Sequence, residues 1–278
     1  MPVSLQFEQV DVFAEHRYEG NALAVVVDAD ELTTQQMQAF ARWTQLSETT
    51  FLLKPQTPEA HYRVRIFTPL RELPFAGHPT LGTCKVWMGL RQNAEQTEIV
   101  QECAAGLIRI RQQGDQLAFS APPLVRSGPL DAETLTAIEQ GLGLTTGQIQ
   151  ASQWVDNGPG WAGVLLANRD QVLAIKPDYA ALRGLNVGVI APWTGAQAQA
   201  DVEVRALMGE ECAEDAVTGS LNASLAQWLI GAGVLNDRYT ASQGTAVGRR
   251  GRLYIERIDD TVWVGGAVQA CMSGRVLL

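Results

Sequence analysis

The sequence predicts an α+β protein built from two similar halves, and three observations support this. Strand-like runs of apolar and β-branched residues outnumber the helix-like segments. The same order of elements, strands followed by a turn, a helix and a hairpin, occurs twice, about 140 residues apart. A segment rich in proline and glycine, 121-APPLVRSGPLD-131, separates the two copies and is the best candidate for a linker. We therefore expect two lobes, residues 1–118 and 119–278, with the terminal strand able to pack on the first.

The first half contains one clear amphipathic helix among its strands. Residues 33–45 begin with two threonines suited to capping, and Met37 and Phe40 recur near helical spacing. A second helix is expected directly after His78, where 81-LGTCKVWMGL-90 is rich in apolar residues. The expected strands are 4–13, 22–27, 49–54, 61–67, 97–103, 107–112 and 116–120.

The second half repeats this plan. A helix at about 131–141 comes first, and the alternating run 201-DVEVRAL-207 resembles 62-YRVRIFT-68 of the first half. A turn that contains glycine then opens a helix, 218-TGSLNASLAQWLI-230, which ends at Gly231. The other expected strands are 151–156, 161–166, 239–243, 252–257 and 261–267.

Composition and charge argue against several classes of function. The formal net charge of −9 leaves no basic stripe to neutralise phosphates, so nucleic acid is not an expected partner. No apolar run approaches the ~20 residues that span a bilayer, and the start of the chain lacks the features of a signal peptide. The four cysteines are scattered without a CxxC pair, so we expect reduced thiols in a cytoplasmic protein rather than zinc sites or disulfides.

Several common catalytic motifs are missing from the sequence. It contains no GxSxG, Walker A or HExxH motif, and nothing indicates nicotinamide or flavin binding, so we expect neither a cofactor nor a metal. The run 248-GRRGR-252 contains glycine and arginine but precedes an expected strand. We interpret it as a hairpin turn with solvated arginines rather than as a phosphate loop.

Two turns that precede helices are candidate ligand sites. In 76-AGHP-79 we expect Pro79 at the first helical position, with His78 near the cap and the amides of Thr80 and Leu81 free. In 218-TGS-220 we expect Thr218 to cap the helix while Gly219 allows close backbone approach. A helix N-terminus binds anions through unpaired N–H groups and its dipole. Either turn alone is often only a cap, but their matching places in the repeat favour a shared cleft for a small carboxylate.

Proton transfer at such a site requires titratable groups with shifted pKa values. Glu48 stands between a helix and a very apolar strand, where burial would raise its pKa. Asp215 precedes the second helix closely, and His78 is a third acid–base group. Structural roles are the alternatives: Glu48 as a capping-box partner near Ser47, and Asp215 as a turn or capping residue in an acidic loop.

Six segments of the sequence form a specific combination: 10-VDVF-13, 20-GNALAVV-26, 46-LSETTF-51, 67-FTPLRELPFAGHPTLG-82, 214-EDAVTGS-220 and 243-QGTAVGRRGR-252. In their order and spacing, these segments resemble the phenazine-biosynthesis-like (PhzF-like) isomerase family, whose fold is related to diaminopimelate epimerase and proline racemase. The string ELPFAGHPTLG is the most specific of the matches.

This resemblance implies two lobes, each a strongly curved, barrel-like mixed sheet around a central helix, that enclose the active site. It implies that Glu48 shuttles a proton between carbon atoms without a cofactor, and that the family tends to form homodimers. Five further residues would hold or polarise the substrate, three by their side chains and two by backbone donors: His78, Asp215 and Ser220, and Gly77 and Gly219. Related epimerases carry protons on two cysteines at these helix starts, where this chain has AGHP and TGS, so two-thiol racemisation is not expected.

The chain departs from the usual family pattern at two places. It has Ala22 where GNP is common, and Ala216 and Leu221 where EDPVTGSA is common. We expect slightly looser loops and, at Leu221, altered packing or pocket shape. The sequence thus predicts a cofactor-independent isomerase of a small carboxylate-bearing metabolite. The alternatives are an epimerase or dehydratase that uses the same cleft, or a non-catalytic binding protein that keeps the fold.

Overall fold

The computed structural model describes residues 3–91 and 97–278, which form two compact units. The first unit comprises Met1–Ser120 together with Gly265–Leu278, and the second comprises Ala121–Val264. The division expected from the sequence placed 119–278 in the second lobe but allowed the terminal strand to pack on the first. In the structure the last strand leaves the second unit after Val264 and completes the first.

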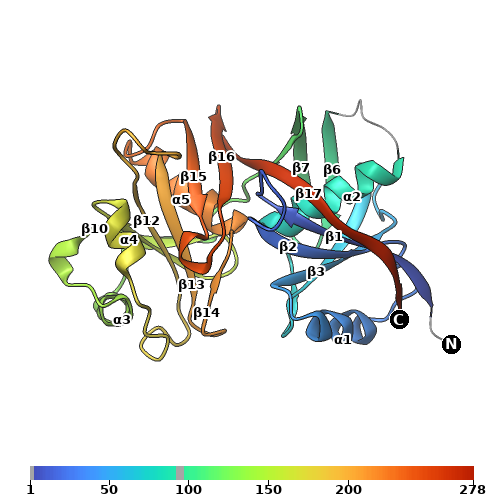
Figure 1. Cartoon of the computed structure of the whole chain (residues 1–278), viewed down its shortest axis with the longest axis horizontal. Coiled ribbons are helices and arrows are strands. Elements are labelled where there is room, and N and C mark those ends of the chain that lie inside the picture. Colours follow the sequence, from blue (N-terminus) through green and yellow to red (C-terminus); the bar gives the residue numbers. More distant parts are fainter. Residues whose placement is uncertain (1–2, 92–96) are drawn as a thin grey trace. The chain divides into compact units, whose positions relative to one another are not determined.

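In the described part of the first unit, eight strands close into a barrel around the helix α2 Gly77–Arg91 (Figure 1). The ring runs β1–β2–β3–β4–β6–β7–β8–β17 and returns to β1, and the short β5 Glu72–Leu73 pairs beside it with β4. Helix α2 is buried along most of its length, as expected for a helix inside a barrel. The bounds are β1 Ser4–Val12, β2 Asn21–Val26, β3 Glu48–Leu53, β4 Tyr62–Phe67, β6 Glu98–Cys103, β7 Gly106–Gln113, β8 Gln116–Ser120 and β17 Thr261–Leu277.

Helix α1 Thr34–Thr44 covers part of the outside of this barrel (Figure 1). Thr33 forms a capping box with Gln36, which satisfies backbone N–H groups at the helix start and confirms the predicted cap. The apolar face of the helix, with Met37 and Phe40, packs against Phe51 of β3. The amphipathic pattern therefore encodes a helix with only one buried side, unlike α2.

The second unit repeats the arrangement around α5 Gly219–Gly231, which is also almost fully buried. Its strands are paired in the order β9–β10–β11–β12–β13–β15–β16–β17, with the short β14 Ala213–Asp215 on β13. Helices α3 Ala132–Leu142 and α4 Arg169–Ala174 contribute to the core on the other side of the sheet. The bounds are β9 Arg126–Gly128, β10 Ile149–Asp156, β11 Trp161–Leu166, β12 Asn186–Pro192, β13 Val202–Met208, β15 Arg238–Gln243 and β16 Gly251–Ile258.

Strand register shows which residues of the two units correspond. In the parallel pair β2–β3, Leu23 lies opposite Glu48, and in the parallel pair β11–β12, Trp161 lies opposite Asn186. Glu48 and Asn186 therefore occupy the same position in the fold.

The same argument aligns the two central helices. Leu73 pairs with β4 and Asp215 pairs with β13, and each precedes the first residue of its helix by the same distance in the chain. This makes Leu73 correspond to Asp215, and His78 correspond to Ser220. The predicted duplication is thus present in the register as well as in the order of elements.

Candidate active site

Three polar side chains meet at the start of α2 in the first unit. His78 is the second residue of the helix and its side chain is only 3% exposed. Its Nε2 lies 3.4 Å from Oε2 of Glu48, and its Nδ1 lies 3.4 Å from Nδ2 of Asn21. The strands β2 and β3 begin with Asn21 and Glu48, so the barrel delivers both side chains to the helix start.

The contacts of His78 suit one tautomer of the neutral ring. With Nδ2 of Asn21 assigned as the donor, Nδ1 of His78 accepts and the ring proton is on Nε2, the nitrogen that faces Glu48. Burial lowers the pKa of His78 to about 3, which keeps the ring neutral at neutral pH. Glu48 therefore faces the N–H of a neutral imidazole, and the close contact is not an ion pair of two charged groups.

Glu48 is held at the edge of the buried region. Its side chain remains 15% exposed, whereas the next two residues of β3, Thr49 and Thr50, are fully buried. Oγ1 of Thr83 on α2 donates to Oγ1 of Thr50 over 2.8 Å, which ties β3 to the central helix. No helix begins near Ser47, because Glu48 opens a strand, so the capping-box alternative for Glu48 is wrong.

A turn that was not predicted from the sequence positions Asn21. Oδ2 of the buried Asp11 on β1 accepts a hydrogen bond from the backbone N–H of Gly20 over 3.1 Å. This bond fixes the residue before Asn21. The available signal was the pair of segments VDVF and GNALAVV, which contain these residues but do not show that they touch.

The start of α2 differs in detail from the expectation. The helix begins at Gly77, so Pro79 is the third helical residue rather than the first. The amide of Thr80 is not free, because it donates to the carbonyl of Ala76 over 3.2 Å. The groups without an acceptor within the helix are the N–H groups of Gly77 and His78, since Pro79 has none.

In the second unit the acidic side chain before α5 belongs to a buried network. Asp215 is 8% exposed, and its Oδ2 accepts a 2.6 Å hydrogen bond from Oγ1 of Thr218. Thr218 is the N-cap residue, but its side chain makes no capping hydrogen bond, so the predicted cap is wrong in this respect. The hydroxyl is directed to Asp215 instead.

Gln243, which was not predicted from the sequence, binds the residues around this helix start. Its Oε1 accepts from the backbone N–H of Thr218 over 3.0 Å and from Nδ2 of Asn222 over 2.8 Å. Its Nε2 donates to Oγ1 of Thr218 and to the carbonyl of Asp215. Gln243 is fully buried, and its hydrogen bonds hold the EDAVTGS turn in one conformation.

Ser220 is also fixed by neighbours in its own unit. Its Oγ accepts a 3.2 Å hydrogen bond from Nε1 of Trp161, and its carbonyl accepts a 2.9 Å bond from Nδ2 of Asn157. The structure thus groups Glu48 and His78 with Gly77 in the first unit. Asp215 and Ser220, with Gly219 between them, form the corresponding group in the second. That the two groups serve one cleft remains a prediction from the sequence.

Three further observations concern the residues that the structure describes. Among these residues, no group of three or more His, Cys, Asp or Glu side chains is placed to hold a metal ion. The four cysteines are free, and burial raises the pKa of Cys84 on α2 to about 12, so this thiol is a poor proton carrier. No described helix is both long and apolar enough to cross a membrane.

Comparison with known proteins decides the family. The family model described as "Phenazine biosynthesis-like protein" matches residues 10–274. The chain belongs to the phenazine biosynthesis-like family. A trans-2,3-dihydro-3-hydroxyanthranilate isomerase of Pseudomonas aeruginosa is 33% identical over 286 residues, which cover 97% of this chain and 98% of that relative. Antisense-enhancing sequence 1 of Schizosaccharomyces pombe is 32% identical over 292 residues, 97% of each chain.

Solved structures agree with this family and with the predicted fold class. A PhzF family protein from Enterococcus faecalis has a TM-score of 0.80 at 27% identity, covering 99% of this chain and 100% of its own. A hydroxyproline epimerase from Agrobacterium vitis shares the fold, with a TM-score of 0.62 at 14% identity over 99% and 93% of the two chains. The epimerase-like α+β prediction is confirmed. Since several relatives are named isomerases, this member of the phenazine biosynthesis-like family is an isomerase.

One departure from the family pattern has a clear structural counterpart. Leu221, on the first turn of α5, packs directly over Gly188 of β12, and a Cβ at residue 188 would overlap its side chain. The larger residue on the helix is therefore accommodated by a glycine on the strand beneath it, inside the second unit.

Proposed function

We propose that this isomerase moves a proton between two carbon atoms of a small carboxylate-bearing metabolite, with Glu48 as the proton carrier and without a cofactor. The observation that supports this best is the pairing of a partly exposed Glu48 with the buried, neutral His78. A carboxylate beside a neutral N–H is oriented by it yet keeps more basicity than one paired with an imidazolium ion.

In the proposed reaction Glu48 removes a proton from one carbon of the substrate, and the electron pair left behind shifts the double bond. The protonated Glu48 then donates a proton to another carbon. Because Glu48 is partly exposed, its carboxyl proton exchanges with solvent between the two steps. No redox partner is needed, because the substrate and product have the same composition. Negative charge that develops on the substrate would be stabilised by the N–H of His78 and by the backbone N–H groups that open α2.

We propose further that Asp215, Gly219 and Ser220 bind and polarise the substrate. Their support is the matching place of this turn in the second unit and the hydrogen bonds that hold it rigid. The relatives named for a dihydro-hydroxyanthranilate favour a cyclic, amino-acid-like carboxylate as substrate class. On the family resemblance alone we also propose a homodimer, which the molar mass from light scattering would test.

The test is proton exchange by Glu48→Gln in heavy water. The variant keeps the shape of the side chain but cannot act as a base, so it should fold normally and lose exchange of substrate C–H by about 10²–10⁴-fold. Glu31→Gln, a substitution of an exposed carboxylate on the same unit, is the matched control and should exchange at the wild-type rate.

The product distinguishes the proposal from its alternatives. NMR in heavy water should show a moved double bond, with deuterium at the new carbon. Deuterium in the unchanged starting skeleton would indicate an epimerase, and release of water from the substrate would indicate a dehydratase. Wild-type exchange by Glu48→Gln would remove Glu48 from the mechanism.

A further inference from the structure

A cavity in the second unit, separate from the residues assigned above, has four arginines among its nine lining residues. Its volume is about 370 Å³. Four arginines and Trp193 make up more than half of its lining residues, and none of the lining residues is acidic. The arginines are Arg169, Arg249, Arg250 and Arg252.

Two of these arginines are held rigidly toward the cavity. Nη1 of Arg252 donates to Oγ of Ser242 over 3.0 Å, and Nη2 donates to Oε1 of Gln199 over 3.3 Å. The guanidinium of Arg169 lies 4.0 Å from the ring centroid of Trp193, and its Nε donates to the buried Glu203 over 3.0 Å. Such contacts remove the rotamer freedom that a flexible surface arginine would lose on binding.

The other two arginines are placed by the turn that precedes β16. Gly244 and Gly248 both have positive φ, 96° and 74°, a conformation that favours glycine. The backbone N–H of Arg249 donates to the carbonyl of Gly244 over 2.8 Å, which closes the turn. The run GRRGR lies where the hairpin of β15 and β16 turns, as expected from the sequence, and Arg250 in it is exposed. Its three arginines also line this one cavity together.

The concentration of positive charge contrasts with the rest of the chain. The protein has a formal net charge of −9, yet four of its 21 Lys and Arg residues converge on this one cavity. An anion bound among several guanidinium groups interacts favourably with each of them. Their forked N–H donors match the oxygens of phosphate.

A neighbouring hollow suggests where the organic part of a ligand would lie. It has a volume of about 590 Å³, shares Arg169, Trp193 and Gln199 with the first cavity, and continues along residues 196–198. Trp193 offers an apolar face beside this hollow. We propose that the second unit binds a small phosphate monoester, with its phosphate among the four arginines and its organic group along Trp193.

The experiment measures binding of inorganic phosphate and of phenyl phosphate to the full-length protein by calorimetry, with thermal unfolding as a second readout. Sodium chloride at matched ionic strength controls for general charge screening. Both phosphates should raise the melting temperature above the chloride control, and phenyl phosphate should bind more tightly.

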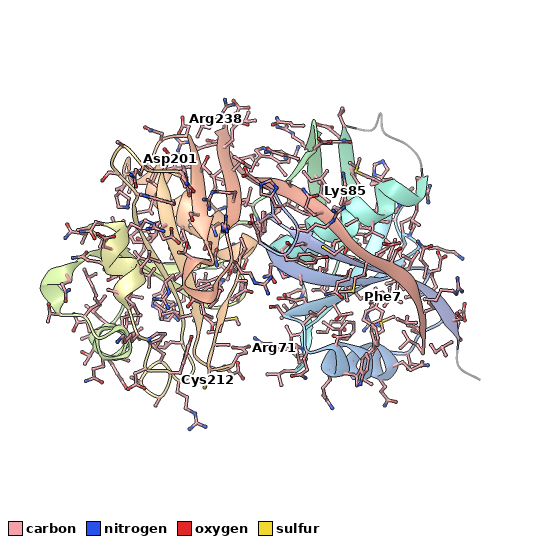
Figure 2. All side chains as sticks on the ribbon, viewed as in Figure 1. Phe7, Arg71, Lys85, Asp201, Cys212 and Arg238 are labelled. Atoms are coloured by element: carbon pink, nitrogen blue, oxygen red, sulfur yellow. The ribbon has the colours of Figure 1, made fainter. Side chains whose placement is uncertain are left out.

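Both variants replace an exposed arginine, so both should fold as the wild type does. Arg250→Ala removes an exposed arginine of the cavity and should weaken phosphate binding at least about 10-fold while the melting temperature in chloride stays unchanged. Arg238→Ala is the matched control: Arg238, labelled in Figure 2, opens β15, pairs with Glu256 and does not line the cavity.

Three results would overturn the proposal. The first is stabilisation by phosphate no greater than by chloride, and the second is equal weakening by Arg250→Ala and Arg238→Ala. The third is binding of citrate but neither phosphate, which would make the site one for a polycarboxylate.

Discussion

The two units place different chemistry at corresponding positions of the same fold. In the first unit the second residue of the central helix is His78, and the neighbouring parallel strand begins with Glu48. In the second unit the corresponding residues are Ser220 and Asn186, and Nδ2 of Asn186 donates to the backbone carbonyl of Pro159 instead of meeting the helix. The first unit has an acid–base pair at this point, whereas the second has two neutral side chains.

In the second unit the carboxylate near the helix start comes from a different element of the fold. Asp215 lies on β14, where the first unit has the apolar Leu73, and its partner is the hydroxyl of Thr218. The duplicated fold therefore supplies two helix starts with different side chains around them. Under the proposed function, the first start carries protons and the second binds the substrate. Four substitutions or conditions test this contrast, beyond the loss expected for Glu48→Gln.

The largest effect is expected when His78 is replaced by the residue of the second unit. His78→Ser removes the N–H that faces Glu48, so proton exchange should fall about 100-fold, or about 2.7 kcal/mol in barrier. His78→Gln, which can place a donor near the same point, should recover most of the rate. Exchange rates in heavy water measure both, and equal loss in the two variants would show that the donor is not what matters.

Gly188→Ala should destabilise the second unit by about 1–3 kcal/mol, because the added Cβ overlaps Leu221. Combining it with Leu221→Ala should recover part of the loss, since the smaller helix residue makes room. Urea unfolding at equilibrium measures the free energies of unfolding. In the first unit the contact between strand and helix joins Thr50 of β3 to Thr83 of α2. Thr50→Ala is therefore the comparison, and its effect on the free energy of unfolding should not depend on residue 221.

Asn21→Ala should slow proton exchange about 10-fold with little change in KM, because Asn21 positions the ring of His78 without touching the reacting atoms. The variant should also show a mixture of His78 tautomers in ¹⁵N NMR spectra, which a purely structural role would not produce. Trp161→Phe, which removes the donor to Ser220 in the second unit, is the comparison and should leave the His78 signals unchanged.

The smallest effect concerns pH. The pKa of His78 is about 3 in the folded state against about 6.5 when unfolded, so between these values the unfolded chain binds more protons. Stability should therefore fall as the pH drops below about 6.5, by about 1 kcal/mol between pH 6.5 and 5.5, and should level off near pH 3. In the second unit Ser220 has no such dependence. Urea unfolding of wild type and His78→Gln at both pH values should show a smaller drop in the variant.

Much of this contrast between the two units could be predicted from the sequence, because short segments of the chain encode it. The helix at 33–45 is encoded by its caps and spacing, and the order of elements identified the repeat. The resemblance of short segments indicated Glu48 and His78, which the structure brings together at one helix start. Their catalytic roles remain proposals.

The parts of the site that could not be predicted depend on contacts between residues far apart in the sequence. Asn21 lies 57 residues from His78, and Gln243 lies 25 residues from Thr218, so no spacing rule connects them. The hydroxyl of Thr218 was expected to cap its helix, but it donates to Asp215 instead, while Gln243 accepts from the backbone N–H of Thr218. The elements β12 and α4 were not predicted, because a glycine-containing run of seven residues and a six-residue helix are too short to show a period.

The path of β17 has a consequence for how the chain folds during synthesis. Its end pairs with β1, and the backbone groups of Val3 and Leu278 bond to each other at distances of 2.6 and 3.0 Å (Figure 1). The barrel that begins the chain therefore cannot close until the last residues have left the ribosome, although the second unit is continuous from residue 121 to 264. Until then β1 and β8 are unpaired edges exposed to other chains. Joining the adjacent ends and opening the chain at the linker would give a circular permutant in which the first barrel is continuous.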